Sequence, residues 1–300
     1  MNKPGFLTTL AIGDAFGACF EGLPARNDDA APIKLEGYPK NPRWKTLGGG
    51  RYTDDAQMSL GLAEFLIATP DLKTATPVSL ANYFVKAYQR DPRGGYMPGF
   101  RSLLESCADG SDFLARIRPH SDKSGAAMRA GVCGFFSDRN DVVDLAMWQA
   151  SLTHATLPGM VSAAVSALMV WYCREGVDPV DIPAEIDGMF PGFGLNEPWE
   201  GFVPNLGIPV VRAALTALCA GTQSDILSAA VGFGGDVDTV AAVVMGPAAM
   251  HPDIVSDLPA ALIDGLENGP FGLDFLKALD EKLLARFGIG HDDLVVGSQQ

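Results

Sequence analysis

The chain has 300 residues, of which 47% are hydrophobic and 19% are charged, so its composition is that of a globular protein and not of a disordered one. Its formal net charge of −14 argues against nucleic acid and anionic membranes as partners. The cysteines are odd in number and form no C-x-x-C pair, so we expect free thiols and a cytoplasmic location: they are Cys19, Cys107, Cys133, Cys173 and Cys219.

Helical periodicity dominates the chain, and the alternation typical of strands is almost absent. We therefore predict an all-α fold, a compact orthogonal assembly of a dozen or more helices, in a single domain that spans residues 1–300. No repeat of 20–50 residues divides the sequence. In chain order, the predicted helices cover residues 4–19, 54–68, 77–90, 99–107, 124–137, 140–152, 158–175, 207–220, 223–233, 238–250, 258–267 and 272–287.

Two helical stretches carry features that need an explanation. Gly13 and Gly17 in the helix 4–19 indicate that another helix approaches closely, and we interpret Asp14 as the cap or support of a neighbouring loop. The stretch 156–173 is uncharged and long, but it contains proline, glycine and several serines. We therefore predict a buried core helix there and not a membrane span.

A first acidic cluster lies in YTDDAQM, residues 52–58, where Thr53, Asp54 and Asp55 begin a predicted helix. One interpretation is structural, because Thr53 is a good N-cap residue and Asp54 with Gln57 resembles a capping box. Acids in a first helical turn also suit the helix dipole. Capping needs only one side chain per helix, however, and this cluster supplies three side chains that carry oxygen.

A second cluster lies in GGDVDTVAAVV, residues 234–244, where Asp236, Asp238 and Thr239 precede an apolar run. No Lys or Arg lies between residues 213 and 276, so these acids lack a local basic partner. Carboxylate and hydroxyl oxygens suit Mg²⁺ or Mn²⁺, and two such cations would balance the four aspartates of both clusters. Zinc is disfavoured because no HExxH or Cys/His spacing occurs.

Six elements, in this order along the chain, resemble the ADP-ribosylglycohydrolase family, which includes the dinitrogenase-reductase-activating glycohydrolase. The resemblance covers most of the chain, and the paired acidic motifs are its specific part. The matching elements are GDAFGACFEG (13–22), YTDDAQM (52–58), DPRGGY (91–96), SGAAMRAG (124–131), LTH (152–154) and GGDVDTVAAVV (234–244).

The resemblance implies an all-α fold with a binuclear Mg²⁺ or Mn²⁺ site that binds the distal ribose and activates water. It also implies cleavage of the bond between C1″ of that ribose in ADP-ribose and an amino-acid side chain. By the same matching, Ser124 and Gly125 bind the substrate near its diphosphate and His154 lines the ligand cleft, although a core histidine is the alternative. The implied metal ligands are Thr53, Asp54, Asp55, Asp236, Asp238 and Thr239.

We expect Glu21, Asp55 and Asp238 to be the catalytic residues. Some members of the family carry a catalytic Asp in the loop after the third helix, but this chain has no Asp between residues 94 and 108. That difference favours Glu21, the acid at the end of the first motif, as the residue that acts beside the metals. The structural alternative for Glu21 is a solvated helix end.

The expected partner is an ADP-ribosylated protein or an ADP-ribosyl small molecule, and the expected assembly is a monomer. Three other classes of function compete with the hydrolase. They are a catalytically silent relative that binds ADP-ribose or has a structural role, a metal-dependent phosphohydrolase, and an all-α interaction protein. The sequence leaves open whether the acceptor of ADP-ribose is arginine, serine or another group, and whether the metal is Mg²⁺ or Mn²⁺.

Overall fold

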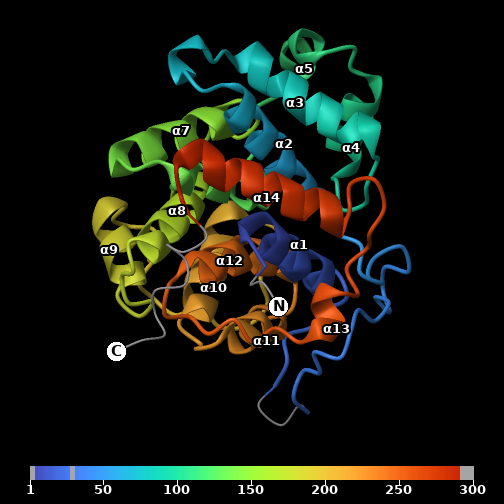
Figure 1. The fold of residues 1–300 in the computed structure, drawn as a ribbon, viewed down its shortest axis with the longest axis vertical. Coiled ribbons are helices and arrows are strands. Elements are labelled where there is room, and N and C mark those ends of the chain that lie inside the picture. The colour runs from blue at the N-terminus through green and yellow to red at the C-terminus, as the bar shows by residue number, and fades with distance from the viewer. Residues whose placement is uncertain (1–3, 28–30, 291–300) are drawn as a thin grey trace.

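In the computed structural model, helices pack around a central pair, α1 and α12 (Figure 1). The structure describes residues 4–27 and 31–290, and within these it has isolated β-bridges between loops but no sheet. The predicted all-α fold is confirmed. The α-helices are α1 (Phe6–Gly17), α2 (Asp54–Ala68), α3 (Pro77–Arg90), α4 (Pro98–Ser106), α5 (Gly110–Arg116), α6 (Ala127–Ala130), α7 (Arg139–Ser151), α8 (Leu157–Arg174), α9 (Ile182–Met189), α10 (Gly207–Leu218), α11 (Gln223–Gly232), α12 (Val237–Met250), α13 (Ala260–Ile263) and α14 (Leu273–Phe287). The 3₁₀ helices are η1 (Leu72–Thr74), η2 (Ser124–Ala126) and η3 (Gly131–Phe135).

Helices α1 and α12 are buried along their whole length, which is why neither sequence shows an apolar face opposite a polar one. Two glycines of α1 let the helices touch. A Cβ atom on Gly17 would lie 2.5 Å from the Cα of Asp238, and a Cβ on Gly13 would lie 2.6 Å from the carbonyl oxygen of Ala241. The predicted packing role of both glycines is therefore confirmed.

The start of α1 is capped by a residue from α14, which lies alongside it in Figure 1. The carboxylate of Asp280 accepts hydrogen bonds from the backbone N–H of Leu7 at 2.7 Å and of Thr8 at 3.0 Å, and from the Thr8 hydroxyl at 2.7 Å. First-turn N–H groups have no acceptor within their own helix. Because Gly5 at the N-cap position has no side chain, Asp280 supplies the missing acceptors and ties α14 to the centre.

Two predicted helices differ from the structure. The helix predicted at 124–137 is divided into η2, α6 and η3, because this segment lies so close to α8 that a Cβ on Gly134 would be 2.4 Å from the carbonyl oxygen of Ala167. The helix predicted at 258–267 is limited to α13, since the N–H of Glu267 bonds to the carbonyl of Gly50 instead of continuing the helix. Helices α5 and α9 were not predicted because they have only 7 and 8 residues.

Helix α8 is long and apolar enough to cross a membrane by length and composition, the single such helix in the described part of the chain. However, 72% of its apolar window is buried inside the protein, against its neighbours α7, α10 and α12. Thr156 caps it by accepting a hydrogen bond from the N–H of Gly159 at 3.1 Å. The helix is therefore a core helix, as predicted from its proline, glycine and serine content.

Replacing Gly17 with alanine tests the contact between α1 and α12. The new methyl group would meet backbone atoms of α12, which have no room to rotate away, so we expect a loss of about 1–3 kcal/mol or more in the free energy of unfolding. Gly188→Ala in α9 is the matched control, because a Cβ there meets nothing within 4 Å and alanine favours helix by about 0.5–1 kcal/mol. Urea denaturation measures both, and an unchanged midpoint for Gly17→Ala would contradict the packing described.

Candidate active site and metal centre

Asp14 of α1 is fully buried and holds the start of α2. Its Oδ2 accepts hydrogen bonds from the N–H groups of Thr53 at 2.8 Å and Ala56 at 2.9 Å, and its Oδ1 accepts the Thr53 hydroxyl at 2.8 Å. Thr53 occupies the N-cap position, but its side chain makes no capping bond. The capping-box interpretation of Asp54 and Gln57 is therefore wrong, and the support role expected of Asp14 is confirmed.

Asp236 stands at the N-cap position of α12 and likewise makes no side-chain capping bond. Its Oδ2 accepts the hydroxyl of Ser124 at 2.8 Å, and its Oδ1 accepts the hydroxyl of Thr239 at 2.7 Å. The backbone is fixed as well, since the N–H of Asp236 donates to the carbonyl of Val203 at 2.9 Å. Gly235 has φ +85°, and a Cβ there would lie 2.0 Å from that carbonyl oxygen, so only glycine fits the turn.

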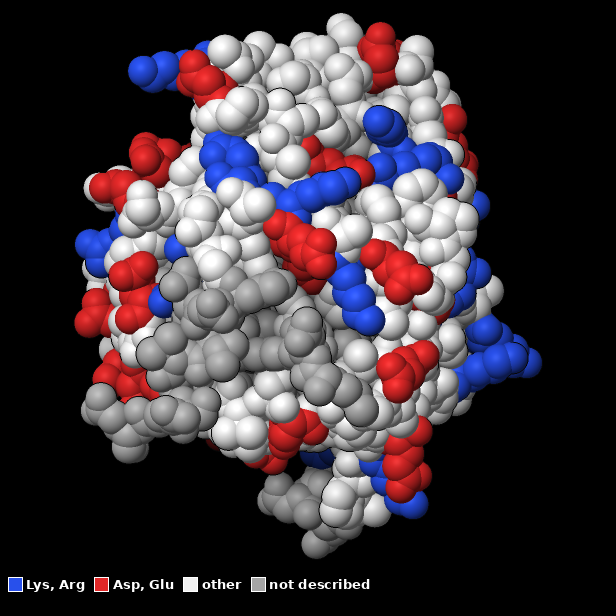
Figure 2. Space-filling view, in the orientation of Figure 1, with Lys and Arg blue, Asp and Glu red and all other residues white. Residues whose placement is uncertain are grey.

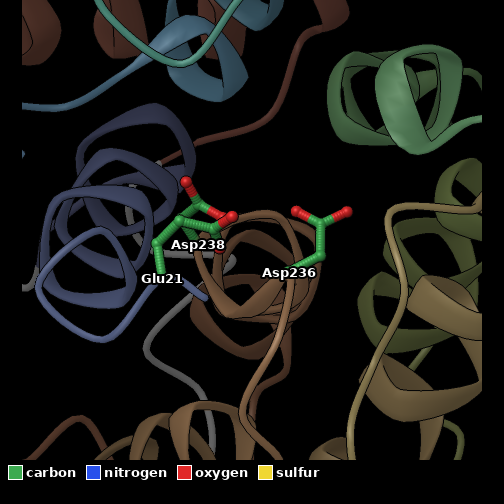
Figure 3. A group of neighbouring side chains, drawn as sticks. All are labelled: Glu21, Asp236 and Asp238. Atoms are coloured by element: carbon green, nitrogen blue, oxygen red, sulfur yellow. The ribbon is translucent and has the colours of Figure 1, made fainter. Parts of the chain in front are cut away.

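Glu21 lies in the turn that follows α1, and this turn is bound to the turn before α12. The N–H of Gly22 donates to the carbonyl of Gly235 at 2.8 Å. Figure 3 shows the carboxylates of Glu21 and Asp238 close together, with Asp236 facing them. One oxygen atom from each of the three carboxylates lies within 4.8 Å of the other two. Residues from the first and last predicted motifs therefore meet at one point.

The two aspartates of α2 complete the acidic cluster, the name we give to Thr53, Asp54, Asp55, Asp236, Asp238, Thr239 and Glu21. Oδ2 of Asp55 accepts the hydroxyl of Thr53 at 3.0 Å, and Asp55 lies near enough to Asp236 for the charge of that aspartate to raise its pKa. Asp54 is set by the loop of residues 91–96, because its N–H donates to the carbonyl of Gly94 at 3.1 Å. Asp54 and Asp55 lie outside the group of three carboxylates within 4.8 Å.

The acidic cluster concentrates negative charge in a buried place. Burial, followed by the charges of neighbouring acids, raises the pKa values of Asp54, Asp55 and Asp238 well above their usual range. Burial also raises the pKa of Glu21 to about 7, and the charge of Asp236 adds to this rise. The cluster is therefore short of positive charge at neutral pH.

Two oxygen atoms of the acidic cluster, Oδ1 of Asp55 and Oε2 of Glu21, are buried without a hydrogen-bond partner. A buried acceptor that stays unpaired is costly, and a cation supplies the partner that it lacks. The available donors are carboxylate and threonine oxygens, which are the atoms that Mg²⁺ and Mn²⁺ prefer. The residues present thus fit a divalent cation, while the number of cations and the full ligand set stay predictions.

The residues predicted to bind substrate lie at the edge of the acidic cluster. Ser124 is bonded directly to Asp236. A Cβ on Gly125 would lie 3.1 Å from Cε1 and 3.2 Å from Nε2 of His154, so the backbone of this turn packs on the imidazole ring. The structure thus brings all three predicted residues together, while their contacts with a substrate stay predictions.

Sequence reasoning missed several residues that hold the cluster in place. Gly95 has φ +98° and lies so close to Asp54 that a Cβ would be 1.8 Å from Oδ1 of that aspartate. Arg93 donates to the carbonyl of Tyr52 at 3.0 Å and keeps the 91–96 loop beside α2. Arg129 is buried under the Ser124 turn. The single basic residue in each of two glycine-containing motifs, DPRGGY and SGAAMRAG, was the available signal.

Known proteins similar to this chain include ADP-ribosylhydrolases of vertebrates. The chain is 32% identical to the ADP-ribosylhydrolase ARH3 of Mus musculus over 188 residues. The aligned region covers 58% of this chain and 49% of that protein. It is 33% identical over 190 residues to the ARH3 of Gallus gallus, covering 57% and 50% respectively. The chain thus spans about half the length of the curated relatives it matches.

The fold has a close counterpart among solved structures. A structure described as an ADP-ribosylglycohydrolase-related protein complex superposes with a TM-score of 0.70 at 25% sequence identity, and covers 94% of this chain and 96% of its own. The family model for ADP-ribosylglycohydrolase matches residues 4–291, which include every predicted motif. The chain therefore belongs to the ADP-ribosylglycohydrolase family.

Proposed function

We propose that the protein is a metal-dependent hydrolase that removes ADP-ribose from a modified amino-acid side chain by cleaving the glycosidic bond at C1″. The observation that carries the proposal is the acidic cluster, where two helix starts and the turn after α1 bring together oxygen atoms, two of them unpaired and buried. The family match and the names of the ARH3 relatives support the same reaction class.

The proposed cofactor is a pair of Mg²⁺ or Mn²⁺ ions held by Thr53, Asp54 and Asp55 at the start of α2 and by Asp236, Asp238 and Thr239 at the start of α12. When bound, such cations supply positive charge that orients adjacent ribose hydroxyls and polarises water. Hydrogen bonds from Thr53 to Asp14 and from Ser124 to Asp236 order some of these oxygens in the metal-free protein, which supports the proposal.

Glu21 is the proposed acid–base residue beside these ligands. Cleavage of a glycosidic bond through an oxocarbenium-like transition state requires negative charge near C1″ and a group that transfers a proton. Without cations, burial raises the pKa of this carboxyl to about 7, where a carboxyl exchanges its proton readily at neutral pH. Glu21 also has one oxygen to which no donor among the described residues is hydrogen-bonded.

The proposed substrate is an ADP-ribosylated protein or an ADP-ribosyl small molecule, whose diphosphate lies by Ser124 and Gly125 and whose distal ribose lies by the acidic cluster. The net charge of −14 supports a partner other than nucleic acid. On the face in Figure 2, acidic and basic side chains of the described residues are interspersed and form no continuous basic surface. A cytoplasmic monomer is the proposed working form.

The test of the proposed function is incubation with ADP-ribosyl-arginine and ADP-ribosyl-serine peptides, with and without Mg²⁺ or Mn²⁺. We expect metal-dependent release of ADP-ribose from at least one peptide, and loss of release in Asp55→Ala and Asp238→Ala. Each change removes one acid from a like-charged group, so the metal-free protein should stay as stable as the wild type. Asp144→Ala, an exposed position on α7, is the control. Binding of ADP-ribose without release from any peptide would instead indicate a catalytically silent relative.

The metal-free protein should become less stable as the pH rises, because the buried acids then lose their protons. The pKa of Glu21 rises on folding from 4.5 to about 7 and that of Asp14 from 3.8 to about 6, mainly through burial. The folded state therefore binds more protons than the unfolded state between about pH 4 and pH 7, and the stability from these groups is lost as pH rises through that window. We expect a higher Tm at pH 5 than at pH 7.5 without metal.

Added Mn²⁺ should reverse this trend, because the cations replace the missing protons at pH 7.5. At a concentration 100 times the Kd, a cation that binds only the folded state stabilises it by about 2.7 kcal/mol. The increase in Tm should be smaller at pH 5, where protonated carboxyls bind cations weakly. Differential scanning calorimetry at both pH values measures this, and a Tm at pH 7.5 that Mn²⁺ leaves unchanged would contradict the metal site.

Glu21→Gln separates acid–base chemistry from binding. The amide keeps the shape of the carboxyl but carries no charge and transfers no proton, so turnover should fall by about 10²–10⁴-fold. The affinity for ADP-ribose should stay within about tenfold, because contacts with the diphosphate are unchanged. Glu281→Gln on the exposed side of α14 is the control. Turnover close to that of the wild type would mean that Glu21 is only a helix-end residue.

A further inference from the structure

Arg129 in α6 is a buried cation that the proposed chemistry does not use. It is 1% exposed, and all its hydrogen-bond acceptors among the described residues are neutral. Its Nε donates to Oε1 of Gln149 at 2.7 Å, and its Nη1 donates to the carbonyl of Gly125 at 2.7 Å. Burying a charge without an acidic partner costs free energy, so the neutral partners of this arginine indicate a role in positioning other residues.

The Nη2 atom of Arg129 is connected to His154 through the hydroxyl of Thr153. This Nη2 donates to Oγ1 of Thr153 at 2.8 Å, and the same Oγ1 lies 2.7 Å from Nδ1 of His154. Arginine has only donors, so Thr153 accepts from it. The one hydrogen of the hydroxyl then has Nδ1 of His154 as its acceptor, since the described residues offer it no other.

This direction of donation decides where the proton of the imidazole lies. A ring nitrogen that accepts a hydrogen bond carries no proton, so Nδ1 is bare and the proton of the neutral ring is on Nε2. Nε2 faces the backbone of Gly125 and has no protein hydrogen-bond partner among the described residues. Helix α8 also lies close to this residue, since a Cβ on Gly159 would be 2.9 Å from the Cβ and 2.9 Å from the carbonyl oxygen of His154.

We propose that Arg129 and Thr153 are positioning residues that hold His154 as a neutral Nε2–H donor, aimed at an oxygen atom of the ligand beside Ser124 and Gly125. His154 then orients the ligand and does not act as a general base. The identity of the ligand, an ADP-ribosyl group, rests on the proposed function. The position of the proton rests only on the hydrogen bonds within the protein.

The charge around His154 agrees with a ring that stays neutral. Burial, followed by the positive charge of Arg129, lowers the pKa of His154 to about 3. The Gly125 turn packs against the ring, the start of α8 at Gly159 packs against the Cβ and carbonyl of His154, and neither glycine carries a charge. The backbone of His120 pairs with that of His154, and its own side chain is exposed.

Nuclear magnetic resonance of the wild type tests the proton position directly. Long-range ¹H–¹⁵N spectra of the imidazole rings distinguish the Nδ1–H form, the Nε2–H form and the charged ring. His154→Gln identifies the signals, and His251 is an internal reference for Nε2–H because its Nδ1 accepts the N–H of Asp253 at 3.1 Å. We expect His154 to show Nε2–H without change from pH 8 to pH 5. A proton on Nδ1, or a charged ring in that range, would overturn the inference.

Thr153→Val and Thr153→Ser test the chain of donors. Valine has the shape of threonine without the hydroxyl, so His154 should lose its fixed form and populate Nδ1–H as well, while serine should keep the wild-type spectrum. ADP-ribose, measured by calorimetry, should bind about threefold to tenfold more weakly to Thr153→Val, as expected for one neutral hydrogen bond, and normally to Thr153→Ser. A Thr153→Val protein with the wild-type spectrum and affinity would overturn the inference.

The two proposals fail in different ways. If the wild-type protein binds no ADP-ribose, the proposed function is wrong. The position of the proton on His154 still tests whether Arg129 and Thr153 fix the form of the ring. If ADP-ribose binds and is released from peptides, but His154 carries its proton on Nδ1, the function stands and the positioning role is wrong.

Discussion

The contact between α1 and α12 at Gly17 is the constraint on which the rest of the site depends. Because Gly17 has no side chain, the end of α1 lies directly on the start of α12, and the turn that follows puts Glu21 beside Asp238. One turn earlier in the same helix, Asp14 reaches the start of α2 and fixes Thr53. A single buried helix thereby sets the positions of both acidic motifs.

The cost of this arrangement is electrostatic, and the apolar helices around it offset that cost. The acids of the cluster are gathered where burial and mutual repulsion disfavour their charges. Helix α12 is buried along its whole length, so its apolar residues fix Asp236 and Asp238 in place. The clustered acids therefore lower the stability of the metal-free protein. Cations bound at the two unpaired oxygens of Glu21 and Asp55 would offset that loss.

The sequence allowed the long helices and the acidic motifs to be predicted, because periodicity and an excess of oxygen-bearing side chains are local signals. The caps were not predictable, since Asp280 and Leu7 are 273 residues apart and Asp14 and Thr53 are 39 apart. The break at 124–137 depends on the backbone of α8 approaching Gly134, which no local pattern reports. The chain from Arg129 through Thr153 to His154 likewise exists only once α6 and α7 have packed.

The most direct test of the central claim is anomalous diffraction from crystals soaked in Mn²⁺. If the acidic cluster is a binuclear centre, two adjacent peaks roughly 3.5–4 Å apart should appear between the aspartates of α2 and those of α12. If no peaks appear at saturating Mn²⁺, or if they lie elsewhere on the protein, the acidic cluster is not a binuclear metal centre.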